Sequence, residues 1–486
     1  MKKPRYAAEA LLAGIVLAVL SATPGAGQTT AAGAPDLARG STSAVLARGY
    51  SPRASGEPEA RPSTVLPRIL NFREQVAAVN RITTLRLQRI LPAVMEKTGT
   101  DMWIIVSNED NLDPVFKTMI PMDVWCPIVQ ILVFSKKPGQ PVERLNLSRT
   151  DMKGLHKDAW DWRAWDNEKK ESQWDALARV VRERVPKTIA INESEEIWAA
   201  GGLTTALKER LVKTVGPEVA KRFRSGVDLA TLWLETLLDE ELDLYDRAVS
   251  IAHALIAEAL SSRAITPGVT TTDDLLYYYN QRVVDLGLKL FAWPTFRIRY
   301  RDPKDVERWG AADTVIRTGD YIVTDAGIEY LRYYTDHTEW AYVLRPGETD
   351  VPAGVRAVMA EANRLQDVFL GEFKEDRSGN EILAAILATA KAKGIPGPRI
   401  YSHSIGLFLH EPGPLIGLPW EQVDTGVRGR VKLVPNSTFT AELSVAAPVP
   451  EWDGREMRLS QEQVVAFTSR GATILDGRQT RFHLVK

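Results

Sequence analysis

The chain has 486 residues, a formal net charge of −1 and a single cysteine. This length predicts two domains, and the near-neutral charge gives no support for nucleic acid or an acidic membrane surface as a partner. Because Cys126 has no second cysteine to pair with, an intramolecular disulfide is excluded.

Residues 1–27 have the pattern of a secretory signal peptide. A basic start precedes an apolar run from Ala10 to Leu20, and small residues follow. The run is too short for a comfortable membrane span, although an uncleaved anchor is the alternative. Residues 28–66 are rich in Ala, Gly, Ser, Pro and Arg, which predicts a disordered linker. We therefore expect a secreted or periplasmic protein with no stable membrane insertion after cleavage.

The first domain is expected over residues 67–232. From Phe72 onward, apolar residues recur at the three-to-four spacing of a helix. Strand-like runs at 102–107, 128–134 and 188–192 then alternate with helical stretches. This alternation predicts a three-layer α/β domain.

The second domain is expected over residues 233–486, with an α+β character. Apolar residues between Leu244 and Leu255 predict a first helix. Thr271 and the residues just after it are good N-caps for a second helix, and strand-like segments dominate after Phe291.

Two aspartates lie next to apolar, strand-like sequence in this domain. In YIVTDAG, Asp325 follows the apolar run YIVT and precedes Ala-Gly, and Asp336 belongs to YYTDHTEW, which is predicted as a second strand ending in AYVL. A hairpin would bring the two carboxylates together, where cations would relieve their repulsion. Either aspartate alone would be read as a turn or cap residue.

Two glutamates have comparable contexts. In TFTAELSV, read as one strand, Glu442 shares a polar face with hydroxyl residues while the other face is apolar. Such a strand is typical of a polar cavity wall, and an exposed outer face is the alternative. Glu462 precedes the apolar run VVAF, where an unpaired acid would be costly to bury.

His403 and His410 lie in the segment YSHSIGLFLHEPGP. On a regular strand their odd spacing would place them on opposite faces, so a bend near Gly406 is required if both serve one site. A lone histidine is more often a hydrogen-bonded structural residue, but two in one short segment indicate a site.

Four carboxylates and one imidazole are suited to two divalent cations such as Mn²⁺, Co²⁺, Zn²⁺ or Fe²⁺. Two such ions side by side can share a hydroxide and polarise a carbonyl group, so a hydrolase is the leading hypothesis. The proposed ligands are Asp325, Asp336, His403, Glu442 and Glu462.

These segments, in this order, resemble the metallopeptidases that include methionine aminopeptidase, Xaa-Pro aminopeptidase and prolidase, of the creatinase superfamily. YIVTDAG and YYTDHT look like that family's Asp-x-Gly and Asp-x-Thr hairpin, and HSIGLFLHEPGP is similar to its His-containing segment. The resemblance covers residues 70–480 and implies a creatinase-like N-terminal α/β domain followed by a pita-bread catalytic domain. It implies an Xaa-Pro aminopeptidase or dipeptidase that cleaves a small peptide between its N-terminal residue and proline, using a hydroxide that bridges two metals. A homodimer is consistent with it, because dimers are common in the family.

The resemblance also implies a role for each residue. Asp325 would chelate the first metal, Asp336 and Glu462 would bridge, and His403 and Glu442 would complete the two sites, with Mn²⁺ as the favoured metal. Glu442 would be the general base, and His410 would hydrogen-bond the substrate carbonyl or the oxyanion. Thr338 would orient a ligand carboxylate. Substrate-binding residues are not assigned.

The sequence departs from the family pattern at three places. The stretch RIRYRDPKDVERWGAADT lacks the histidine usually found upstream of the first aspartate, and Arg308 or Trp309 falls near its place. Serines flank His403 where the family has glycines, and Ser460 stands where an arginine is usual, so Arg458 would compensate only with a shifted register. These departures keep two alternatives open: a metal-dependent lyase or ester hydrolase, and a non-catalytic binding scaffold.

Overall fold

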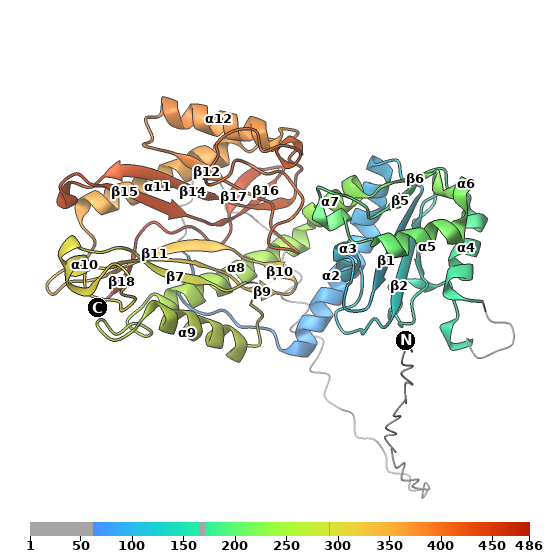
Figure 1. Ribbon diagram of the computed structural model, residues 1–486, viewed down its shortest axis with the longest axis horizontal. Coiled ribbons are helices and arrows are strands. Elements are labelled where there is room, and N and C mark those ends of the chain that lie inside the picture. Colours follow the sequence, from blue (N-terminus) through green and yellow to red (C-terminus); the bar gives the residue numbers. More distant parts are fainter. Residues whose placement is uncertain (1–61, 165–170, 291) are drawn as a thin grey trace, which may run out of the picture.

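A computed structural model describes residues 62–164, 171–290 and 292–486 (Figure 1). The predicted signal peptide and all of the predicted linker before residue 62 lie outside these residues. Within the described ranges, no helix combines the length and the apolar character needed to cross a membrane.

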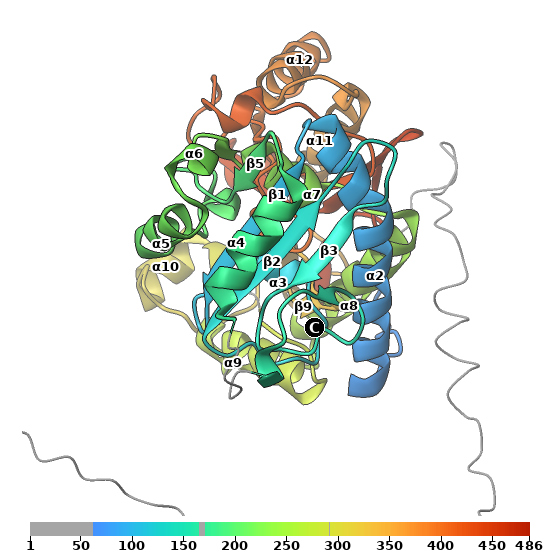
Figure 2. The same ribbon diagram turned by 90° about the vertical axis from the view of Figure 1, so that its right-hand side faces the viewer.

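The N-terminal part is a three-layer α/β unit, as predicted (Figure 2). Its mixed sheet has the order β4-β3-β2-β1-β5-β6. The strands are β1 (Met102–Asn108), β2 (Val129–Ser135), β3 (Glu143–Asn146), β4 (Lys157–Asp158), β5 (Ile189–Ile191) and β6 (Phe223–Ser225). The helices are α2 (Phe72–Lys97), α3 (Pro114–Thr118), α4 (Gln173–Arg184), α5 (Thr205–Val215), α6 (Pro217–Ala220) and α7 (Val227–Glu235).

The central strands are apolar on both faces because helices cover both sides of the sheet. Ile104 and Val133 belong to a core shared with α4 and α5, whereas Ile105 and Leu132 face a second core shared with α2 and α7. Successive residues of a strand point to opposite faces, so a near-continuous apolar run is what a doubly covered strand requires.

The C-terminal part has two sheet layers with helices outside them (Figure 1). One layer is the sheet β18-β11-β8-β7, against which α8 and α9 pack. Its elements are α8 (Asp239–Ala259), α9 (Thr272–Asp285), β7 (Thr295–Tyr300), α10 (Pro303–Trp309), β8 (Tyr321–Ala326), β11 (His337–Val343) and β18 (His483–Val485). A short hairpin, β9 (Glu329–Tyr330) and β10 (Tyr333–Tyr334), lies between β8 and β11.

The other layer consists of the sheets β12-β14-β15 and β13-β16-β17. Helix α11 packs on β14, and α12 packs on α11. The elements are α11 (Ala353–Glu372), α12 (Gly379–Ala392), β12 (Arg399–Tyr401), β13 (Ser437–Thr440), β14 (Glu442–Pro448), β15 (Glu456–Gln461), β16 (Val464–Thr468) and β17 (Gly471–Ile474).

The long helix α2 connects the two parts of the chain through buried contacts. Arg86 of α2 forms an ion pair with Glu241 of α8, with 2.8 Å between Nη1 and Oε2, and both side chains are almost fully buried. Glu241 also accepts a hydrogen bond from the Tyr333 hydroxyl at 3.0 Å. The predicted boundary at residue 232 falls inside α7.

Local sequence signals located several elements well. Helix α2 begins at Phe72 as predicted, and Thr271 caps α9 by accepting a hydrogen bond from the Asp274 amide at 3.1 Å. The runs predicted as strands correspond to β1, β2 and β5.

Two predictions about strands were wrong. Asp336 lies immediately before β11 rather than within a strand. TFTAELSV is not one strand, because it breaks at Ala441 into β13 and β14, which belong to different sheets. The Ala441 amide leaves both ladders and donates to the Gln463 carbonyl at 2.7 Å.

Candidate metal centre and active site

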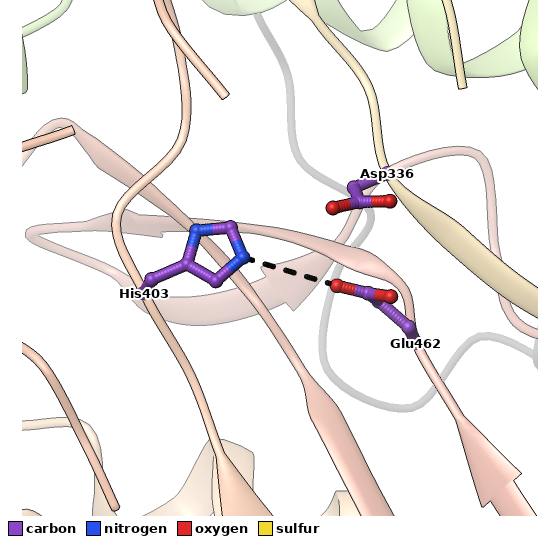
Figure 3. Close-up of side chains that lie close together, drawn as sticks. All are labelled: Asp336, His403 and Glu462. Atoms are coloured by element: carbon purple, nitrogen blue, oxygen red, sulfur yellow. Dashed lines mark ion pairs between the residues drawn. The ribbon is translucent and has the colours of Figure 1, made fainter. Parts of the chain in front are cut away.

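Asp336, His403 and Glu462 form the most compact group of metal-ligand side chains in the described structure (Figure 3). One ligand atom from each lies within 4.8 Å of the other two, and all three residues are buried. His403 Nε2 is 4.0 Å from Glu462 Oε1. Asp336 Oδ1 and Glu462 Oε1 have no hydrogen-bond partner. Buried oxygens without partners, facing an imidazole nitrogen, fit a divalent cation.

The β8–β11 hairpin brings the other aspartate to this group. Thr338 of β11 pairs with Asp325 of β8, and the charge of Asp325 acts on the Asp336 carboxyl group. Burial and the negative charges of Asp325 and Glu442 raise the pKa of Asp336 well above its usual range. The structure thus concentrates carboxylates where only cations would make their charges favourable.

Glu442 completes the set from the opposite sheet layer. It is the first residue of β14 and lines a cavity of about 390 Å³ together with Asp325 and Thr338. Burial, and then the charge of Asp325, raise the pKa of Glu442 to about 8. All four predicted carboxylates therefore surround one site, although only Asp336 and Glu462 belong to the compact group.

The orientation of His403 leaves one ring nitrogen free for a ligand bond. Nδ1 lies 3.1 Å from the Ser404 carbonyl, to which it donates, so Nε2 carries the lone pair that faces Glu462. Burial, with a smaller effect of His410, lowers the pKa of His403 to about 3, so the ring is neutral. A neutral imidazole is the form that binds metals.

His410 approaches His403 because the chain bends between them, as predicted. The ring centroids are 4.4 Å apart. The Glu411 amide donates to the Ser404 carbonyl at 2.9 Å, and the Leu407 amide donates to Glu411 Oε1 at 2.7 Å. A Cβ at Gly406 would lie 2.9 Å from Glu411 Oε2, so glycine suits this turn. His410 itself is exposed.

Two hydroxyl groups support the ligands. Thr338 Oγ1 donates to Glu462 Oε2 at 3.2 Å. Thr440 Oγ1 accepts from the His403 amide at 3.4 Å, and the Thr440 amide donates to the His403 carbonyl at 3.0 Å. These contacts fix the side chain of one ligand and the backbone of another.

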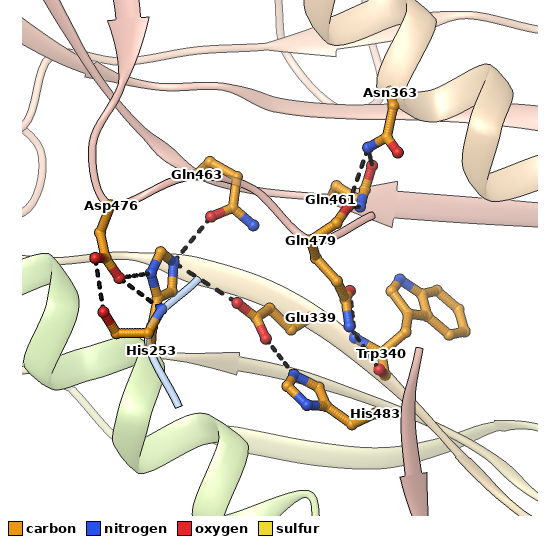
Figure 4. Close-up of polar contacts among 10 residues, drawn as sticks. His253, Glu339, Trp340, Asn363, Gln461, Gln463, Asp476, Gln479 and His483 are labelled. Carbon is orange, nitrogen blue, oxygen red and sulfur yellow. Dashed lines mark hydrogen bonds and ion pairs between the residues drawn. The ribbon is translucent and has the colours of Figure 1, made fainter. Parts of the chain in front are cut away.

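A buried polar network of the C-terminal part includes histidines to which the sequence assigned no role (Figure 4). His253 Nδ1 lies 2.9 Å from Asp476, and Nε2 lies 3.0 Å from the Gln463 side-chain oxygen. Although burial disfavours the charged ring, these acceptors and the charge of Glu339 raise its pKa. Glu339 also contacts His483. Because Gln463 adjoins Glu462 in the chain, the network holds the backbone beside this proposed ligand.

His337 faces this network rather than the ligands, as the alternation of a strand predicts. It is fully buried, and its ring centroid is 4.3 Å from that of His253. Burial and the nearby His253 lower its pKa well below the usual range. His337 therefore does not replace the histidine missing upstream of Asp325.

The sequence interpretation missed two groups near the site. Trp198, from the N-terminal part, donates its indole N–H to the His410 carbonyl at 3.1 Å. Arginines on β7 and β12 line the cavity. The alternation of arginines in RIRYR is the sequence signal for the two on β7, and Arg399 of β12 has no comparable signal.

Comparison with known proteins identifies the C-terminal part. Residues 243–469 match the model of metallopeptidase family M24. This part of the chain is an M24 metallopeptidase domain. The match covers the proposed ligands Asp325, Asp336, His403, Glu442 and Glu462, and the M24 domain has the pita-bread fold predicted from the sequence. No curated protein matches the chain.

Several solved structures align with both the N-terminal and the C-terminal part of this chain. An X-Pro aminopeptidase from Thermotoga maritima is 20% identical, with a TM-score of 0.55, over 80% of this chain and 98% of that one. A putative aminopeptidase P from Bacillus anthracis is 13% identical, with a TM-score of 0.54, over 82% and 96%. A dipeptidase from Mycobacterium ulcerans is 15% identical, with a TM-score of 0.51, over 83% and 98%. At these identities the likeness concerns the fold.

Proposed function

We propose that the chain is an exported Xaa-Pro peptidase that hydrolyses the bond between an N-terminal residue and proline with the help of two divalent metal ions. The observation that carries this proposal is the meeting of Asp336, His403 and Glu462, with Asp325 and Glu442 beside them, in an M24 domain. The names of structurally similar aminopeptidases and dipeptidases support the same reaction class. The basic start and apolar run at the N-terminus support export.

The donor set fits two cations, with Mn²⁺ favoured and Co²⁺, Zn²⁺ or Fe²⁺ acceptable. When bound, such ions supply hydroxide near neutral pH and polarise a carbonyl group. The protein's own groups then have distinct tasks. Glu442, on the cavity wall, accepts the proton of the attacking water. His410, exposed beside His403, donates a hydrogen bond to the carbonyl oxygen as negative charge develops on it. Thr338 keeps the Glu462 carboxylate oriented.

A second candidate is a metal-dependent lyase or ester hydrolase acting on a non-peptide substrate. The specific observation is that residues 297–314, which include α10, contain no histidine, and that His337 faces away from the ligands. A site that lacks one substrate-binding group could accept a different substrate without losing its metals.

The first experiment compares matched Xaa-Pro and Xaa-Pro-Xaa peptides with the mature protein in Mn²⁺ and after chelation. We expect metal-dependent release of the N-terminal residue, and the relative rates separate a dipeptidase from an aminopeptidase. No release from protein that demonstrably holds two metals would contradict peptidase activity and favour the second candidate.

Removal of one central ligand tests the metal assignment directly. In Asp336→Ala, we expect the metal content to fall below two ions per chain and kcat/KM to fall by at least about 10²-fold, because the group that organises transition-state charge is lost. Elemental analysis and peptide hydrolysis measure the two effects. The matched control is Glu375→Ala, which removes an exposed acid distant in sequence from every ligand. Full metal content in Asp336→Ala would refute the assignment.

A further inference from the structure

Glu235 is a buried acid to which the reaction proposed above assigns no task. It is the last residue of α7, and only 2% of its surface is exposed to solvent. Neither of its carboxylate oxygens has a hydrogen-bond partner among the described residues. An ionised carboxylate without partners is very costly to bury, so such a group takes up a proton instead. The surroundings of this side chain therefore favour a neutral carboxylic acid.

The carboxyl group of Glu235 faces the His403–Pro414 segment, which carries His410. A Cβ at Gly413 would lie 2.9 Å from Glu235 Cδ and 2.6 Å from Ser404 Oγ. Because Gly413 has no side chain, the acid can approach this backbone closely. Ser404 is fully buried, and its hydroxyl group also has no partner among the described residues. The end of α7 therefore meets this segment at Gly413, close to the Ser404 hydroxyl group.

The charges around Glu235 disfavour its ionised form. Glu411 is a second buried acid, and its Oε1 accepts a hydrogen bond from the Leu407 amide at 2.7 Å, whereas Glu235 accepts none. The C-terminal end of a helix also carries partial negative charge, and Glu235 ends α7. Burial, and then the charge of Glu411, raise the pKa of Glu235 well above its usual range, against the effects of Lys97 and Arg428. Burial raises the pKa of Glu411 to about 8. Of the two acids, Glu235 therefore holds its proton more firmly.

The nearby cations do not pair with these acids. Arg428 Nη2 donates to the backbone carbonyl of Glu411 at 2.5 Å, and its Nε has no partner among the described residues. Arg86 forms its ion pair with Glu241, at 2.8 Å. Lys97 is exposed at the end of α2, where solvent screens its charge. A proton on the acid of α7 is therefore the simplest way to balance the buried charge.

A neutral acid can donate a hydrogen bond, and the unpartnered Ser404 hydroxyl group can accept one. We propose that Glu235 is a positioning residue: as a neutral carboxylic acid, it docks the end of α7 against Ser404 and Gly413. This contact keeps the His403–Pro414 segment, and with it His410, in place for turnover. The effect on turnover rests on the peptidase function proposed above.

Infrared spectroscopy tests whether this acid carries a proton. In heavy water at neutral pH, we expect the difference between wild type and Glu235→Gln to contain the carbonyl stretch of a protonated carboxylic acid, which an ionised carboxylate lacks. The control Glu209→Gln removes an exposed acid on α5 and should reveal only an ionised carboxylate. An ionised signal from Glu235 would overturn the proposal.

The pH dependence of stability reports the same proton. The ordinary pKa of a glutamate is about 4.3, so above that pH the unfolded chain loses a proton that the folded chain keeps. Wild type therefore loses stability as the pH rises, whereas Glu235→Gln lacks this loss. As the pH rises from 5 to 7, we expect the ratio of the wild-type to the variant unfolding constant to increase by up to about tenfold per pH unit, measured by urea denaturation. A ratio that does not change with pH would contradict a neutral Glu235.

Turnover separates a positioning acid from an ordinary core residue. With Mn²⁺-loaded protein and Ala-Pro-Ala, we expect kcat/KM of Glu235→Gln to stay close to the wild-type value, because an amide has the shape of a neutral acid. Glu235→Ala should lower kcat/KM by about tenfold at unchanged metal content, the equivalent of one lost hydrogen bond. Glu235→Leu fills the space without a hydrogen-bonding group, so it should resemble Glu235→Ala in turnover even where it folds more stably. Wild-type turnover in the alanine and leucine variants, or an equal loss in all three variants, would overturn the positioning role.

A measurement on His410 itself separates this proposal from the proposed function. The chain has six histidines, so histidine-labelled protein gives few ring signals in NMR spectra, and His410→Ala assigns the signal of His410. If no peptide is cleaved, this signal replaces the kinetics. We expect it to be unchanged in Glu235→Gln and shifted or broadened in Glu235→Leu. A signal that is unchanged in both variants would overturn the positioning role, whatever the substrate is.

Discussion

His410 is exposed, whereas its neighbour His403, a proposed metal ligand, is buried, and this difference predicts separate effects of the two residues. In His410→Ala, we expect turnover of an Xaa-Pro peptide to fall by about 10²- to 10³-fold, because an oxyanion donor is lost. Metal content should stay at the wild-type value, since the ring Nδ1 of His403 is held by Ser404 rather than by His410. Kinetics and elemental analysis on the same sample check both statements. Loss of metal from His410→Ala would show that it is a ligand instead.

A second histidine makes the stability of the N-terminal part depend on pH. His156 is buried, with Nε2 2.8 Å from the Met119 carbonyl and no partner for Nδ1. Burial lowers its pKa to about 4. The folded pKa is thus below the unfolded value of about 6.5, so the unfolded chain takes up the proton first as the pH falls. The stabilising contribution of the neutral ring is complete above pH 6.5 and is lost between pH 6.5 and 4.

The variant His156→Gln keeps a donor for the Met119 carbonyl but does not titrate in this range. Between pH 7.5 and 5, we expect wild type to lose about 2 kcal/mol of unfolding free energy more than the variant does. Urea denaturation followed by tryptophan fluorescence measures the difference. Parallel pH profiles for the two proteins would rule out His156 as the titrating group.

At the level of elements, the signals that predicted structure correctly are local ones. Thr271 and Asp274 form a capping box within four residues, so the start of α9 can be read from the sequence. The break at Ala441 cannot be read from the local sequence, because the Ala441 amide is hydrogen-bonded to Gln463, which lies between β15 and β16. Side-chain alternation still predicted the apolar face of this segment, since Phe439, Leu443 and their neighbours lie in the core.

Two ion pairs connect helices α2 and α8, and we expect them to contribute very unequally to the free energy of unfolding. The Arg86–Glu241 pair is buried, whereas the nearby Arg89–Glu240 pair, also 2.8 Å long, is largely exposed. In Arg86→Met, we expect a loss of about 3–5 kcal/mol, because Glu241 would keep a buried charge without its partner. Arg86→Met/Glu241→Gln should recover much of that loss.

The exposed pair is the matched control for this prediction. Arg89→Met should cost less than about 1 kcal/mol, as exposed ion pairs do. Urea denaturation of the single and double variants gives the coupling energy for each pair. Similar coupling energies for the buried and exposed pairs would contradict the role assigned to burial.

For the whole molecule, the order of the proposed ligand segments predicted the catalytic domain and its fold. The other residues that surround the site come from segments far apart in the chain, so the sequence did not predict them. The cavity beside Asp325 and Glu442 is lined by arginines of β7 and of β12, two strands that lie about 100 residues apart in the chain. The sequence of neither strand indicates that the other lines the same cavity. The contact of Trp198 with the His410 segment spans 212 residues and joins the two parts of the chain, so no local pattern reports it.

From this contact we predict that the N-terminal part positions His410, the proposed donor to the substrate carbonyl. Trp198 Nε1 donates to the His410 carbonyl at 3.1 Å, and the indole packs edge-on against Phe408 with 4.9 Å between centroids. In Trp198→Phe the ring remains but the donor is lost, so we expect kcat/KM to fall by about fivefold, the equivalent of one neutral hydrogen bond. Trp198→Ala should lower it further by removing the aromatic pair.

Metal content should be unchanged in both variants, because all five proposed ligands belong to the M24 domain. The control is Trp125→Phe, which alters an exposed tryptophan in the same part of the chain. If Trp198→Phe matched wild type in kcat/KM, the hydrogen bond would not position His410. If Trp198→Phe instead lost metal, the contact would also hold the proposed ligand His403 in place, since His403 and His410 lie in one short segment.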